Sequence, residues 1–369
     1  MRQTTRDGRR RRLGRLGRAA ALSLAMVMVP VGGAQAQGLT WEEGLQHDAP
    51  DRYTVVRGDT LWDISGRFLR HPWQWPEVWQ VNPQIRNPHL IYPGDVVYLY
   101  DCNGRPCLGL ERGQGEVRLS PGVRTTPHRE AIEPIPLEAV QHFLREHRVI
   151  DDPEDLDELA YVVGADDHRL VSGAGDRLYA RGRVAGGGRV GLYRIGERYL
   201  DSASGELLGL ELEHVGQARR QRSEDDIVVL EVTSSRQEVR NDDIVLPLES
   251  RELTTQFYPR PPEGEVDGRI LAVPGGVRFI GHLQVVALDR GRRDGLEPGH
   301  VLLVEQQGEL VSDPRTSEAL RLPGEEAGLV MVFRPYEKMS YGLVMKASRT
   351  LAVGDRVRSP QRALGTAQR

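Results

Sequence analysis

The stretch of residues 53–100 constrains the fold of this chain more than any other part of it. It starts and ends with short runs of β-branched and aromatic residues, which are typical of strands. Between them, Leu61, Ile64 and Phe68 recur at helical spacing, and a second helical run starts at Pro76. The sequence therefore predicts strand, helix, helix, strand within about fifty residues, which is enough for one small core.

Turn and capping residues mark the ends of these elements. Gly58 interrupts the first strand, and Asp59 or Thr60 offers a side-chain oxygen that can cap the first helix. The second helix is predicted to end at Asn82-Pro83. Residues 92–95 predict a turn that leads into the closing strand.

This stretch resembles the LysM module, a small βααβ domain that binds glycans containing N-acetylglucosamine, chiefly peptidoglycan in bacteria. The opening and closing motifs of that family are both present at the correct separation. The link between the helices, residues 69–75, is longer than in the shortest LysM domains and carries two tryptophans. The matching residues are Tyr53, Thr54, Val55, Gly58, Asp59, Thr60, Leu61, Trp62, Ile64, Asn82, Ile91, Tyr92, Pro93 and Gly94.

The resemblance implies that the glycan lies between the loop after the first strand and the loop before the second. An acetamido group needs a small apolar pocket for its methyl group, and glycine turns let backbone donors and acceptors approach it closely. Alternatively, these residues serve only the turns of the fold. The glycan-binding residues carried over from the family are Gly58, Asp59, Thr60, Leu61, Ile91, Tyr92, Pro93 and Gly94.

Tryptophan side chains could add stacking, because the C–H faces of a pyranose ring pack on aromatic rings. We expect Trp62 and Trp79 in the core of the domain. For Trp73 and Trp75, stacking on a sugar and packing in the core both remain open.

The first 36 residues are predicted to be a signal peptide. A basic segment precedes an apolar run at residues 19–31, and Ala34 and Ala36 offer small residues before a cleavage site. The apolar run is too short for a permanent membrane span, so we expect an exported, periplasmic protein associated with the cell wall.

The charge of the chain limits its partners. Residues 1–36 contain eight arginines and one aspartate, a charge of +7, so the total of −4 leaves −11 for residues 37–369. An acidic protein does not suit a polyanionic partner, which argues against nucleic acid and against anionic membrane surfaces.

Cys102 and Cys107 are the two cysteines of the chain. In an exported protein, two cysteines that flank a turn most simply form a disulfide. No metal site is expected here, because two thiolates without a nearby histidine are a poor ligand set, and no motif predicts a cofactor. The alternative is a free, nucleophilic cysteine.

The remaining chain predicts mainly β structure, so the expected fold class is α+β. Short strands recur about every ten residues, separated by glycine, proline and aspartate turns, which is typical of barrels and sandwiches. The expected domains are a tether at residues 37–51, the βααβ domain at 52–101, a linker with the cysteine pair at 102–130, a helix and a first β-module at 131–250, a linker at 251–268, a related second β-module at 269–360 and a disordered tail at 361–369.

The two β-modules are predicted to be copies of one unit, with a period of about 110 to 125 residues that is too long for a solenoid. Residues 241–245 (NDDIV) parallel residues 353–357 (VGDRV). We also match residues 205–215 to 325–333, and residues 175–179 to 297–302.

The sequence contains no recognised motif of a wall enzyme. A G-x-S-x-G elbow is absent, the ten histidines are scattered, and both cysteines lie beside the βααβ domain. Paired carboxylates of the muramidase type remain open, because acidic residues cluster at several turns.

The expected function is non-catalytic binding of peptidoglycan, with the β-modules anchored at the wall and presenting a surface to an envelope protein. Two alternatives remain: a peptidoglycan hydrolase with a carboxylate site in residues 131–360, and a scaffold protein of an envelope machine.

Overall fold

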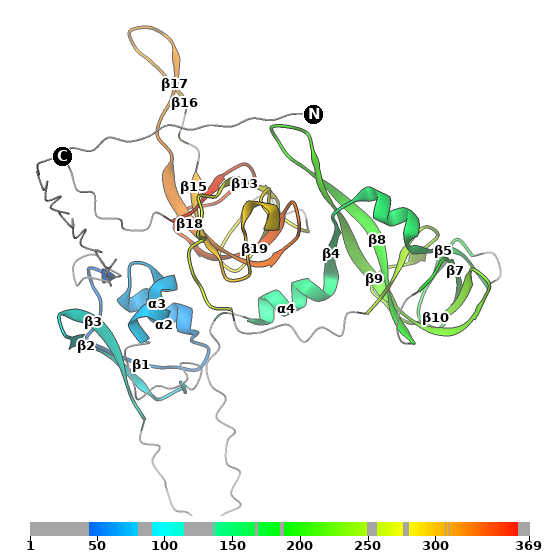
Figure 1. The fold of residues 1–369 in the computed structure, drawn as a ribbon, viewed down its shortest axis with the longest axis horizontal. Helices are drawn as coiled ribbons and strands as arrows, with labels where there is room; N and C mark the ends of the chain where they lie inside the picture. The colour runs from blue at the N-terminus through cyan, green and yellow to red at the C-terminus, as the bar shows by residue number, and fades with distance from the viewer. Residues whose placement is uncertain are drawn as a thin grey trace, which may run out of the picture. The chain divides into compact units, whose positions relative to one another are not determined.

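A computed structural model describes residues 44–79, 91–113, 135, 137–166, 169–184, 188–248, 257–275, 280–306, 308 and 310–360 (Figure 1). The predicted signal peptide, the predicted tail, Asn82 and parts of the predicted tether and linkers lie outside these residues. Among the helices of the described residues, none is long and apolar enough to cross a membrane.

The N-terminal domain is the predicted βααβ unit with one additional strand. Its elements are β1 (Arg52–Thr54), α2 (Leu61–Phe68), the 3-10 helix η1 (Pro72–Gln74), α3 (Trp75–Trp79), β2 (Val96–Cys102) and β3 (Arg105–Glu111). The strands form an antiparallel sheet in the order β1-β2-β3. Side chains from the helices and from the sheet share one core.

The additional strand begins directly after the cysteine pair. Cys102 and Cys107 form a disulfide, as predicted, which closes the hairpin between β2 and β3. Asn103 and Gly104 form its turn with φ values of 58° and 84°, a conformation that asparagine and glycine tolerate best. Residues 105–111, which the sequence analysis assigns to a linker, therefore complete the sheet.

A second part of the chain is a β-sheet preceded by α4 (Leu137–Glu146). β10 pairs with β9 as well as with β7, so six strands close into a ring, here called the first barrel, and β4 extends the sheet beyond it. The strand order is β10-β7-β5-β12-β8-β9-β4. The elements are β4 (His147–Ile150), the 3-10 helix η2 (Pro153–Glu158), β5 (Ala160–Ala165), β7 (Arg177–Arg181), β8 (Arg189–Leu200), β9 (Leu207–Glu224), β10 (Ile227–Ser235) and β12 (Ile244–Pro247), with β6 (Val171–Ser172) paired to β11 (Val239–Arg240).

A third part is a closed barrel of six antiparallel strands, here called the second barrel. Around the ring the strands follow the order β13-β14-β19-β18-β15-β20. The elements are β13 (Asp267–Ala272), β14 (Val285–Leu288), the 3-10 helix η4 (Arg292–Asp294), β15 (Val301–Gln306), β16 (Leu310–Ser312), β17 (Ala319–Arg321), β18 (Glu325–Pro335), β19 (Ser340–Ala347) and β20 (Arg356–Arg358). The predicted α+β class, with a mainly β C-terminal region, is confirmed.

The two barrels have the same topology. If the six strands of each ring are lettered a to f in chain order, both rings follow a-b-e-d-c-f. The register agrees too, because Leu192 pairs with Gly216 in the first barrel as Val304 pairs with Gly328 in the second. This shared pattern supports the predicted internal repeat.

The strand pairing also shows which predicted matches are in register. Asp243 and Asp355 occupy equivalent positions at the start of strand f, so the predicted match of residues 241–245 to 353–357 is in register. The carbonyls of Val215 and Ala327 each accept the N–H groups of the two residues that follow strand e, so Val215 corresponds to Ala327. The predicted match of residues 205–215 to 325–333 is therefore shifted. β7, which follows residues 175–176, corresponds to β14 and not to β15. Alternating apolar residues look alike after a shift along a strand, which explains the first error. Short apolar strands that follow glycine turns also resemble one another, which explains the second.

Strands c and d of each barrel continue outward as a hairpin. We call residues 198–210, at the tip of β8 and β9, arm 1, and residues 310–322, with β16 and β17, arm 2. Figure 1 shows arm 2 projecting from the second barrel.

Candidate functional site

Two loops of the N-terminal domain lie side by side. Loop 1 (residues 55–60) joins β1 to α2, and loop 2 (residues 91–95) precedes β2. The N–H of Val55 donates to the carbonyl of Asp95 at 2.8 Å, and the N–H of Gly94 donates to the carbonyl of Val55, also at 2.8 Å. We call the two loops together the rim.

Loop 1 is closed by its own side chains. The carboxylate of Asp59 accepts hydrogen bonds from the N–H of Val56 at 2.9 Å and from the hydroxyl of Tyr53 at 3.0 Å. Burial raises the pKa of Tyr53, and the bond to Asp59 raises it further. Thr60, not Asp59, is the N-cap of α2, and it forms a capping box with Asp63.

Loop 2 depends on Asp95, a residue that the sequence analysis does not single out. Its carboxylate is buried and accepts hydrogen bonds from the N–H of Tyr92 at 3.1 Å and from the N–H of Gly113 at 3.0 Å. The guanidinium of Arg112 lies 2.8 Å from the same carboxylate. Two of these partners follow β3, beyond the predicted domain boundary, so the sequence alone could not reveal this role.

Glycine gives each loop its backbone conformation. Gly58 has a φ of 96° and Gly94 a φ of 95°, in the region that other residues rarely adopt. A Cβ atom added at either position would meet no atom within 4 Å. The rim therefore leaves open space beside both turns, where a ligand can approach the main chain.

The structure brings all eight predicted glycan-binding residues into, or directly beside, these two loops. Leu61 and Ile91 are fully buried and belong to the core beneath the rim, and Thr60 is buried as a cap. The predicted residues that reach the surface are Gly58, Asp59, Tyr92, Pro93 and Gly94.

All four tryptophans of the domain's described residues are buried. Trp62 and Trp79 are expected in the core, but Trp73 and Trp75 are also only 5% and 1% exposed. Trp75 packs with α2 and the sheet, and Trp73 lies in one apolar cluster with Trp62. In this structure neither ring offers an open face to a sugar.

The buried carboxylates outside this domain hold the fold together. Asp243 is paired with Arg194 at 2.9 Å, Asp289 accepts the N–H of Arg269 at 2.7 Å, and Glu211 lies 2.7 Å from His147. Burial raises the pKa of Asp289. Within the described ranges, no group of three or more histidine, cysteine, aspartate or glutamate side chains could hold a metal ion.

Comparison with known proteins gives two findings for this region. A curated relative, the "Uncharacterized protein YqbP" of Bacillus subtilis (strain 168), is 43% identical over 56 residues. That segment covers 12% of this chain and 26% of the relative, so the chain spans about a quarter of the relative's length. A family model described as LysM domain matches residues 53–99. Residues 53–99 of this chain are thus a LysM domain, a module of the kind that binds glycans containing N-acetylglucosamine.

Proposed function

We propose that this protein is a non-catalytic peptidoglycan-binding protein, exported to the periplasm and held at the cell wall by its LysM domain. The glycan lies along the rim, against Gly58 and Asp59 on one side and against Tyr92, Pro93 and Gly94 on the other. One observation carries the proposal: the hydrogen bonds of Val55 hold two open glycine turns side by side at the surface.

The chemistry of the rim suits a neutral amino sugar. The two rim carboxylates, Asp59 and Asp95, accept hydrogen bonds from the protein and thereby hold the two loops in place. Main-chain groups at Gly58 and Gly94 can then meet the acetamido group. A short neutral surface of this kind binds with a dissociation constant on the order of micromolar to millimolar, so firm attachment needs several modules or a second contact.

The proposal is tested with purified sacculi and the full chain lacking only its predicted signal peptide. Gly58→Asn places a side chain in the open space of the rim while keeping a residue that tolerates positive φ. Gly104→Asn is the matched control, because Gly104 has a φ of 84°, equal open space and a position in the distant disulfide turn. We expect Gly58→Asn to weaken sedimentation with sacculi about fivefold, which is roughly 1 kcal/mol, and Gly104→Asn to leave it unchanged.

An equal loss of sedimentation in both variants, or no loss in either, would mean that the glycan binds elsewhere. Zymography of the unmodified chain on peptidoglycan tests the absence of catalysis separately. A cleared zone would support the alternative of a carboxylate hydrolase in residues 131–360.

A further inference from the structure

The two arms end in the same turn. Asp201 opens the turn of arm 1 and Asp313 that of arm 2, and in each the Oδ1 atom accepts the N–H groups of the residues two and three positions later. The residue four positions later has positive φ, 72° at Gly205 and 59° at Ser317. The glutamates that follow, Glu206 and Glu318, therefore occupy equivalent positions at the two tips.

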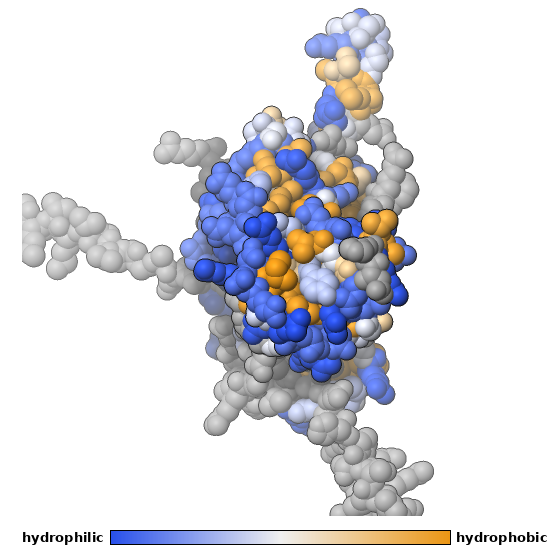
Figure 2. Space-filling model, turned by 90° about the vertical axis from the view of Figure 1, so that its right-hand side faces the viewer, coloured by the Kyte–Doolittle hydropathy of each residue, from blue (hydrophilic) through white to orange (hydrophobic). Residues whose placement is uncertain are grey.

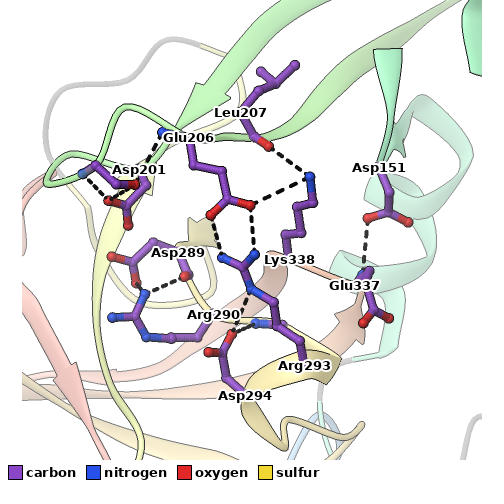
Figure 3. A network of polar contacts seen from close by, with 12 residues as sticks. Asp151, Asp201, Glu206, Leu207, Asp289, Arg290, Arg293, Asp294, Glu337 and Lys338 are labelled. Atoms are coloured by element: carbon purple, nitrogen blue, oxygen red, sulfur yellow. Dashed lines mark hydrogen bonds and ion pairs between the residues drawn. The ribbon is translucent and has the colours of Figure 1, made fainter. Parts of the chain in front are cut away.

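In arm 1, the tip glutamate binds the second barrel (Figure 3). The carboxylate of Glu206 accepts two hydrogen bonds from the guanidinium of Arg293, at 2.8 and 3.1 Å. The ammonium of Lys338 lies 3.6 Å from the same carboxylate and donates to the carbonyl of Leu207. An anionic tip thus meets two basic side chains of the neighbouring barrel.

One face of arm 1 is covered by apolar side chains of that barrel and of α4. Tyr199 and Leu208 are 2% and 0% exposed and belong to one cluster with Phe143, Met339 and Tyr341. The hydroxyl groups of Tyr199 and Tyr341 lie 3.3 Å apart. Arm 1 therefore shows what such a hairpin binds: an apolar protein face bordered by arginine and lysine.

Arm 2 has the same features but leaves them exposed. Counted from the shared turn at Asp201 and Asp313, Leu208 and Leu210 correspond to Leu320 and Leu322, which are 42% and 46% exposed. Figure 2 shows apolar side chains at the surface of the projecting hairpin. Glu318 has no ion-pair partner among the residues that the structure describes. A two-stranded hairpin of this kind is marginally stable in water unless it packs against something else.

On a second copy of this chain, the barrel face equivalent to the one that arm 1 covers does not match arm 2 among the described residues. The apolar face of the second barrel is already covered by arm 1. On the first barrel, Gln221 and Glu231 stand where the second barrel has Phe333 and Leu343, so the equivalent face is polar. Burying two leucines against a carboxylate and an amide would leave those polar groups without water.

We propose that arm 2 docks on a different protein, on an apolar sheet or helix face bordered by arginine or lysine side chains. Leu320 and Leu322 pack on the apolar face, and Glu318 pairs with the basic border as Glu206 pairs with Arg293. The proposal goes beyond glycan binding and does not depend on it.

The test uses the full chain in the cells that produce it, with photoreactive p-benzoylphenylalanine at position 320. The control carries the same group at position 310, which is 63% exposed on the opposite face of the hairpin. We expect a light-dependent adduct of one discrete mass from position 320, at least about fivefold weaker from position 310. Peptide mapping of the adduct should give a segment of another protein with apolar residues and at least one arginine or lysine.

Charge reversal gives the second readout. With the photoreactive group at position 320, Glu318→Arg should lower the adduct yield about fivefold or more, whereas Arg315→Glu at the same tip should not lower it. An adduct with a second copy, an adduct with lipid alone, equal yields from positions 310 and 320, or no adduct would each overturn the proposal. Sacculus binding should be unchanged in all these variants, so a failure here is distinguishable from a failure of the proposed glycan site.

Discussion

At the scale of single residues, one turn recurs through the molecule. A residue with positive φ is followed by an aspartate whose carboxylate accepts the N–H of the residue three positions before it. It occurs at Asp59 and Asp95 in the rim and at Asp176, Asp243 and Asp355 in the barrels. The Gly-Asp turns of the rim are therefore structural in the first place. What distinguishes the rim is that Val55 joins two of them at an open surface.

The repeat predicts the effect of changing one such turn. Asp242 has a φ of 73° where the second barrel has Gly354, so Asp242→Gly relieves strain and should leave the free energy of unfolding unchanged or raise it by up to about 1 kcal/mol. Asp243→Ala removes the partner of Arg194 and of the Arg240 N–H and should lower it by about 2–4 kcal/mol. Thermal unfolding of both variants checks this. Equal effects would contradict the assigned roles.

At the scale of elements, the helices and loops of the βααβ domain were predicted well from the sequence, and the matches between the two barrels were predicted poorly. Residues 53–100 carry their caps, turns and apolar spacing within one short stretch, so the βααβ domain and its rim loops could be predicted. β3 was assigned to a linker, because its arginine, proline and glycine residues are typical of linkers, although it pairs with β2 along its whole length. The two arms were aligned out of register, since β9 runs unbroken from Leu207 to Glu224 while Pro323 and Gly324 interrupt the corresponding strand of arm 2.

The difference between the arms predicts the effect of shortening the same leucine in each. Leu208→Ala removes a fully buried side chain and should lower the free energy of unfolding by about 2–5 kcal/mol. Leu320→Ala changes an exposed side chain and should lower it by less than about 0.5 kcal/mol. Urea unfolding of the purified variants measures both. A large loss for Leu320→Ala would mean that arm 2 is already packed within the isolated chain.

At the scale of the whole molecule, the proposed glycan-binding surface and the exposed arm 2 belong to different domains. The LysM domain takes up a small share of the chain, and the two barrels and their arms make up most of the described remainder. Arm 1 is used within the chain and arm 2 is exposed. On our proposal, the same repeated unit serves an internal contact in arm 1 and an external contact in arm 2.

Net charge gives the last prediction. Residues 37–369 carry a formal charge of −11, and peptidoglycan carries carboxylates, so long-range attraction cannot hold this protein at the wall. If the rim binds through main-chain groups, as we propose, its affinity for sacculi should change less than about twofold between 50 and 500 mM NaCl, where the screening length becomes much shorter. Sedimentation at the two salt concentrations measures this. A loss of affinity of about tenfold or more at high salt would show that exposed arginines, and not the paired loops of the rim, attach the protein.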